Sequence, residues 1–265
     1  MSLPRETPTQ PLARALASRF AAWDAFFSPP GRPLLWLLLT TPLAVALGLL
    51  AGGLWLPLLQ ACAFYPLFAA RLFRSRWKSA VAAALLWAFW TALLVGTVSY
   101  AAPEWSSHRI LRAQAYQEEM FTWVESGRGA EGDIRLFLPQ HALHLGLFSL
   151  LCLLSLGFLG LLMGAVLMNY MSFYVGTLLG YALDMATVLA MAWPPWAMCR
   201  VAGFIFIAAA LSGWAARRLG LPDLADCRLR PALAAGAALI VMDVFLKWWL
   251  APYWQPLLKV STRLP

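Results

Sequence analysis

The residues best able to do chemistry are charged or titratable side chains set within or beside long apolar runs. These residues are Asp184, Arg200, Asp243, Lys247, His141 and His144. Placing a charge at the centre of a bilayer costs about 2.5–3.5 kcal/mol on insertion scales, so such residues usually face a partner or a polar cavity. The sequence therefore predicts an intramembrane polar site at these six positions.

Two interpretations of this site stay open. In the functional interpretation, Asp184 binds a proton or cation in a pocket that opens to the outside, and His141 and His144 tune access near neutral pH. In the structural interpretation, Asp243 and Lys247 lie four residues apart and pair with each other, while Arg200 pairs with Asp184 or reaches toward the membrane surface. The four charges then sum to zero without a ligand, which makes the structural interpretation the simpler one.

Metal or cofactor chemistry has weak support in the sequence. His141 and His144 are three residues apart and share one side of a helix, so together with an acid from the preceding loop they could ligate a metal. No HExxH motif accompanies them, and Cys62, Cys152, Cys199 and Cys227 form no CxxC pair. We therefore expect no metal, no cofactor and no catalytic residue, with both histidines at the start of their helix.

Two short stretches are similar to fragments of membrane-enzyme patterns. Glu118 and Glu119, followed by Phe137 and His141, resemble the EExxxR and FxxxH motifs of membrane CAAX proteases, but Trp123 stands at the arginine position. The run EGDIRLFLPQHALHL is similar to the EG and FLP portion of undecaprenyl pyrophosphatases, but the serines that follow FLP in that family are missing. Each resemblance covers under a tenth of the chain, so neither assigns a role to any residue.

Composition places the chain in the membrane. Of its 265 residues, 62% are hydrophobic and 12% are charged, whereas soluble domains are about half apolar and a quarter charged. The net charge of +8 comes from basic residues that punctuate the apolar runs, a distribution typical of cytoplasmic loops between membrane spans. We expect the lipid bilayer as a partner, and no nucleic acid.

The order of polar and apolar segments predicts an all-α, polytopic protein with about seven transmembrane helices. The expected parts are a cytoplasmic amphipathic segment (1–32), three spans (33–102), an extracytoplasmic loop with an amphipathic helix (103–140), four spans (141–251) and an extracytoplasmic tail (252–265). The interfacial helix in the first part has an apolar stripe of Leu12, Leu16, Phe20, Trp23 and Phe27. Basic clusters at 71–78 and 217–230 require an even number of crossings between them, which gives seven spans in the cell inner membrane with the amino terminus inside and the carboxy terminus outside.

Regularly spaced glycines between positions 157 and 180 predict close helix packing. Gly157, Gly160 and Gly164 are expected on the fourth span and Gly176 and Gly180 on the fifth, where GxxxG spacing lets backbones approach closely. These glycines would contact helices of the same chain or another subunit. The polar middle of this stretch, 169–174, is expected to form the cytoplasmic turn between the two spans, with Asn169 as a helix cap.

The function that these observations favour is that of a non-catalytic integral-membrane subunit or scaffold of a larger inner-membrane complex. The two polar segments, 1–32 and 103–140, are docking surfaces more readily than catalytic domains. A transporter or permease component that uses the polar site is the first alternative. A membrane-embedded enzyme that acts on a lipid, with the histidines and loop acids as acid and base, is the second.

Overall fold

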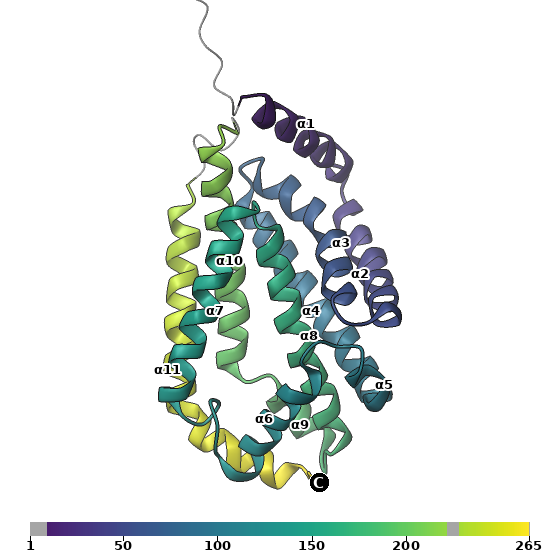
Figure 1. The fold of residues 1–265 in the computed structure, drawn as a ribbon, viewed down its shortest axis with the longest axis vertical. Coiled ribbons are helices and arrows are strands. Elements are labelled where there is room, and N and C mark those ends of the chain that lie inside the picture. Colours follow the sequence, from purple (N-terminus) through teal and green to yellow (C-terminus); the bar gives the residue numbers. More distant parts are fainter. Residues whose placement is uncertain (1–9, 222–227, 265) are drawn as a thin grey trace, which may run out of the picture.

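The computed structural model describes residues 10–221 and 228–264. Regular structure in these ranges is helical (Figure 1), which confirms the all-α class. The helices are α1 (Gln10–Phe27), α2 (Arg32–Ala51), α3 (Trp55–Leu72), α4 (Trp77–Ala101), α5 (Pro103–Ser107), α6 (Ala113–Ser126), α7 (Ile134–Leu154), α8 (Phe158–Gly180), α9 (Met185–Ala192), α10 (Pro195–Arg218) and α11 (Arg230–Ser261). Cys227, one of the four cysteines of the sequence analysis, lies outside the described residues.

The chain is a polytopic membrane protein. Within the described ranges, six helical segments are long and apolar enough to cross a bilayer: Arg32–Ala51, Trp77–Ala101, Ile134–Leu154, Phe158–Gly180, Met185–Arg218 and Arg230–Ser261. The helix α3, which the sequence counted as a span, is not among the six; its 18 residues include Gln60, Arg71 and an internal Pro66. The expected count of seven spans is therefore not confirmed.

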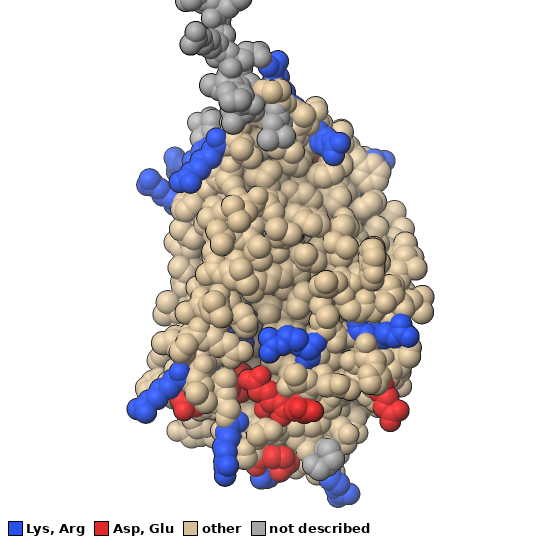
Figure 2. Space-filling model, in the orientation of Figure 1, with Lys and Arg blue, Asp and Glu red and all other residues tan. Residues whose placement is uncertain are grey.

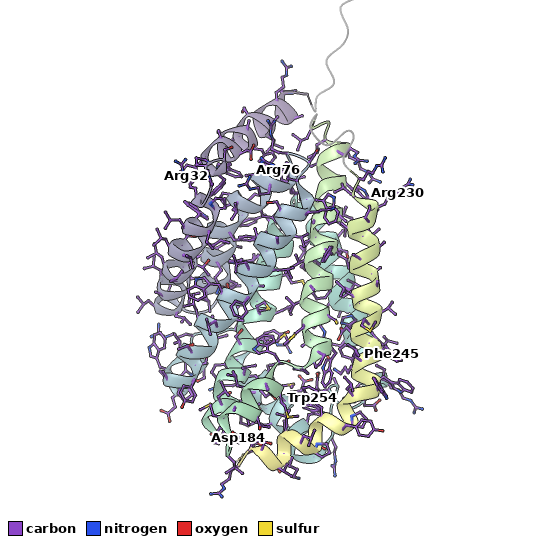
Figure 3. All side chains as sticks on the ribbon, turned by 180° about the vertical axis from the view of Figure 1, so that it is seen from behind. Arg32, Arg76, Asp184, Arg230, Phe245 and Trp254 are labelled. Atoms are coloured by element: carbon purple, nitrogen blue, oxygen red, sulfur yellow. The ribbon has the colours of Figure 1, made fainter. Side chains whose placement is uncertain are left out.

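The two ends of the helix bundle differ in charge. Arg32, Arg76 and Arg230 lie at one end, called the basic end here, and Asp184 and Trp254 lie toward the other (Figure 3). The second end, called the cap end, is built from α5, α6, α9 and the last turns of α11. On the face shown in Figure 2, acidic side chains gather toward the cap end together with basic ones, whereas the side chains coloured by charge at the basic end are mainly Lys and Arg.

The helix α1 lies across the basic end and packs onto the protein itself (Figure 1). Phe20 and Phe27 of its apolar stripe are buried, and the Phe20 ring centroid lies 4.5 Å from that of Phe73, next to α3. The Asp24 carboxylate forms ion pairs with Arg71, Arg74 and Arg76. Contacts with the chain's own α3 therefore cover much of this stripe; the Leu12 side chain lies outside the described side chains.

The predicted turn at 169–174 is wrong, because α8 continues unbroken from Phe158 to Gly180. The chain reverses earlier, between α7 and α8, where Leu156 and Gly157 adopt φ angles of 54° and 94°. A left-handed backbone is easily reached by glycine and suits the start of α8. The run that resembled two helices is a single helix in the interior of the bundle.

The polar middle of α8 is compatible with a helix because its polar groups are satisfied. Asn169 and Gln60 of α3 exchange two side-chain hydrogen bonds, 3.0 Å from Gln60 Nε2 to Asn169 Oδ1 and 2.7 Å from Asn169 Nδ2 to Gln60 Oε1. The Ser172 hydroxyl donates to the Met168 carbonyl within the helix at 2.6 Å. Asn169 therefore joins two helices instead of capping one.

The glycines of α8 face different neighbours. A Cβ atom on Gly160 would overlap Cys152 of α7, and a Cβ atom on Gly164 would contact Phe148, also of α7. A Cβ atom on Gly176 would overlap the carbonyl oxygen of Gly96 and come within 2.8 Å of Ser99 Cβ, both on α4. Gly157 lies against Ser212 and Phe68. A Cβ atom on Gly180 would meet no atom within 4 Å among the described residues.

We expect Gly176→Ala to destabilise the protein and Gly180→Ala to be nearly neutral. The first substitution forces a methyl group into the backbone of α4, and overpacking of this kind costs about 1–3 kcal/mol. The second adds a methyl group in open space on the same helix, which makes it the matched control. Thermal unfolding in detergent measures both, and equal melting temperatures for the two variants would contradict the proposed close approach of α4 and α8.

Candidate polar site

Four charged side chains meet near the cap end of the bundle. Arg200 of α10 forms a bidentate pair with Asp243 of α11, with Nε donating to Oδ2 at 2.9 Å and Nη2 to Oδ1 at 3.0 Å. Lys247 Nζ of α11 donates to Oε2 of Glu131 at 2.6 Å. We call Glu131, Arg200, Asp243 and Lys247 the charge quartet; its formal charges sum to zero.

The quartet is withdrawn from solvent. The side chains of Asp243 and Lys247 are 0% and 2% exposed, and those of Glu131 and Arg200 are 11% and 16% exposed. The Phe137 ring of α7 adds a contact to both cations, with Lys247 Nζ 3.6 Å and Arg200 Cζ 4.8 Å from its centroid. Buried charges are tolerated when they are paired and hydrogen-bonded, and both conditions are met here.

The quartet pairs differently from the sequence-based expectation. Asp243 and Lys247 lie one turn apart on α11, but each pairs with a residue from another segment. A guanidinium matches both oxygens of a carboxylate in one plane, which an ammonium does not do, so Arg200 is the better partner for Asp243. Lys247 is then available to Glu131.

Glu131 reaches the quartet from the loop between α6 and α7. Gly127 and Gly129 in this loop have φ angles of 72° and 111°, backbone conformations that glycine adopts readily as the chain turns back. Trp196 Nε1 of α10 donates to Glu131 Oε1 at 2.7 Å. Burial acts to raise the pKa of Glu131, but the positive charges of Lys247 and Arg200 and the two hydrogen bonds outweigh it and hold this pKa below the ordinary value of 4.5.

Asp184 is not part of the quartet. It lies at the cap end, where it caps α9 by accepting hydrogen bonds from Ala186 N at 3.2 Å and from the Thr187 hydroxyl. The Thr187 bond is the main cause that lowers the pKa of this exposed carboxyl. The expected pairing of Arg200 with Asp184 is replaced by the pair with Asp243, because α8 ends at Gly180 and leaves Asp184 outside the apolar segments.

The two histidines lie inside α7 and not at its start. Asp133 accepts a hydrogen bond from Arg135 N at 2.8 Å and begins the helix eight residues before His141. His141 is buried, and its ring stacks on Phe137 at a centroid distance of 4.9 Å. His141 Nε2 is 3.7 Å from Asp243 Oδ2, too far for a hydrogen bond, and has no other partner in the described part of the chain.

A cavity of about 60 Å³ lies beside the quartet, and both histidines line it. Its polar lining residues are Tyr116, Glu119, Glu131, Gln140, His141, His144, Tyr170 and Arg200. Burial, with a smaller contribution from Glu131, raises the pKa of Tyr116 well above its ordinary value, which favours the neutral phenol. This volume holds a few water molecules.

Metal binding has no geometric support in this part of the bundle. Among the described residues, no group of three or more His, Cys, Asp or Glu side chains is arranged to hold a metal ion.

Comparison with known proteins gives no match to a protein-family model, to a curated protein or to a solved structure. The quartet and the cavity beside it are therefore the features that bear on function.

We expect Lys247→Met to lower the free energy of unfolding by roughly 3–5 kcal/mol, because it leaves Glu131 buried without its main partner. The double variant Lys247→Met, Glu131→Gln should recover most of this loss, since it removes both charges. Lys259→Met is the control: the Lys259–Glu125 pair is about half exposed, with 3.5 Å between Nζ and Oε2, so its loss should cost under about 1 kcal/mol. Unfolding in detergent measures all three, and similar losses for the two single variants would contradict the pairing.

Acid should destabilise the protein through Glu131. Because the folded-state pKa of Glu131 lies below the unfolded value, its stabilising contribution is complete above the ordinary value of 4.5 and is lost as the pH falls through the lowered folded value. Melting temperatures between about pH 6 and pH 3 should therefore fall more steeply for the wild type than for Glu131→Gln. Parallel curves for the two proteins would show that folding does not lower the pKa of Glu131.

Proposed function

We propose that the protein is a non-catalytic integral-membrane subunit or scaffold of a larger inner-membrane complex. The observation that supports this proposal is the closed pairing of the quartet, in which every charge has an opposite charge as its partner. A substrate that displaced one member would leave an uncompensated buried charge, at a cost of about 3–5 kcal/mol. Such a cluster is suited to holding helices in place.

The carboxy-terminal part of α11 is the surface that we propose for contact with another membrane subunit. The helix has 32 residues and is therefore roughly 48 Å long, more than a hydrocarbon core of about 30 Å requires. Beyond Pro252, it exposes Tyr253, Leu257 and Val260 by 68%, 53% and 71%. The spacing of four and three residues places them on one side of the helix.

The orientation that we propose follows from the charges at the two ends. Basic residues gather on the cytoplasmic side of membrane proteins, so the basic end would face the cytoplasm and the carboxy terminus the outside. In this orientation the basic residues meet lipid headgroups, and no role in nucleic-acid binding is needed to explain them.

Copurification from the native membrane tests this proposal. We expect the wild type to retain other membrane proteins in mild detergent and Leu257→Asn to lose at least one of them with an unchanged melting temperature. Leu54→Asn is the matched control, since Leu54 is also an exposed leucine, in the turn between α2 and α3, with 66% of its surface exposed against 53% for Leu257. A wild type that elutes as a single stable chain would overturn the proposal, and equal loss in both variants would remove α11 as the contact.

An enzyme that acts on a lipid is a second candidate, because Glu119, Glu131, His141 and His144 line one cavity. Its acid and base would come from the histidines and these loop acids, so turnover unchanged in a His141→Ala, His144→Ala double variant would remove the histidines from both roles. A transporter that uses Asp184 is less favoured, since this residue caps α9 outside the quartet. Flux that responds to Asp184→Asn, which keeps the cap, would revive it.

A further inference from the structure

A long apolar groove separates α7 from α11. It has a volume of about 660 Å³ and is lined mainly by Leu138, Ala142 and Leu145 of α7 and by Val241, Phe245 and Trp248 of α11. Val241, Phe245 and Trp248 are more than half exposed. The groove therefore opens on the surface that faces the bilayer.

The groove arises because α11 packs closely on α10 and not on α7. Gly236 of α11 and Gly203 of α10 approach so closely that a Cβ atom on Gly236 would lie 3.1 Å from the Gly203 carbonyl oxygen. The groove extends along α7 from Ile134 to Leu145, which is roughly 16 Å of helix, or about half the thickness of a hydrocarbon core. Its length therefore matches one leaflet of the bilayer.

An arginine lies next in the chain to Ile134, the lining residue of α7 that is nearest the cap end. Arg135 is exposed and precedes Ala142 by seven residues, so both lie on the same side of α7. The neighbouring Asp133 uses its carboxylate to accept the backbone hydrogen of Arg135 at the start of the helix. The guanidinium of Arg135 matches the geometry of a phosphate, which it can bind through two hydrogen bonds.

The inner wall of the groove contains an unsatisfied polar group. His141 lines the groove, is 5% exposed, and its Nε2 atom has no hydrogen-bond partner in the described chain. This residue also lines the small cavity beside the quartet, so its ring forms the wall between the groove and the Arg200–Asp243 pair.

We propose that the groove between α7 and α11 binds one phospholipid from the leaflet at the cap end, with an acyl chain in the groove and the phosphate paired with Arg135. The apolar lining and the length of the groove, about one leaflet, match an acyl chain. Arg135 at the cap end matches the phosphate of the headgroup. The site does not depend on the proposed role as a subunit.

Delipidated protein in detergent tests the phosphate contact. Phosphatidylglycerol should raise the melting temperature of the wild type by about 2–4 °C, and diacylglycerol, which lacks the phosphate, by clearly less. Arg135→Gln should reduce the phosphatidylglycerol shift to the diacylglycerol value. Arg128→Gln, a matched change in the exposed loop before α7, should keep the full shift.

A second variant tests the groove. Ala142→Phe fills it without removing a charge, so the response to both lipids should fall and native mass spectrometry should show less bound phospholipid than for the wild type. The proposal is overturned by equal shifts for the two lipids, by equal responses of the Arg135 and Arg128 variants, or by unchanged lipid binding in Ala142→Phe.

Discussion

The bidentate pair of Arg200 and Asp243 is the interaction on which the cap end depends. It joins α10 to α11 at a point where the Asp243 side chain is fully buried and that of Arg200 is largely buried, and it leaves Lys247 to hold the loop residue Glu131. Through Glu131, the loop between α6 and α7 is held against α10 by Trp196. The pairs Arg200–Asp243 and Lys247–Glu131 together hold α10, α11 and the loop between α6 and α7 in place.

Much of the fold could be predicted from hydropathy, because long apolar runs in a chain of this composition have few alternatives to membrane helices. The helix boundaries within the longest apolar run are harder to predict from hydropathy. A stretch of polar and aromatic residues is typical of an interface, but here Asn169 finds Gln60, which lies 109 residues earlier in the sequence. A partner that is distant in sequence cannot be recognised from local spacing, so the local pattern predicts a turn where the protein has a buried helix.

The same reason limits what could be known of the polar site. Arg200, Asp243 and Lys247 stand out in apolar runs, and the structure brings them together. Glu131 is one of several acids in a polar loop, and no feature of its neighbours marks it as buried. The alternative acid, Asp184, stood closer to an apolar run but satisfies itself locally at the start of α9. Charge balance indicates that a second acid belongs with Arg200, Asp243 and Lys247; the sequence favours Asp184, whereas the protein uses Glu131.

The reciprocal amide pair between Gln60 and Asn169 sets the vertical register of α3 against α8. A slide of one helical turn, about 5.4 Å, would carry both amides past each other and leave four polar groups facing hydrocarbon. The pair therefore fixes the position of α3, which is not among the six helical segments long and apolar enough to span a bilayer, along the axis of α8.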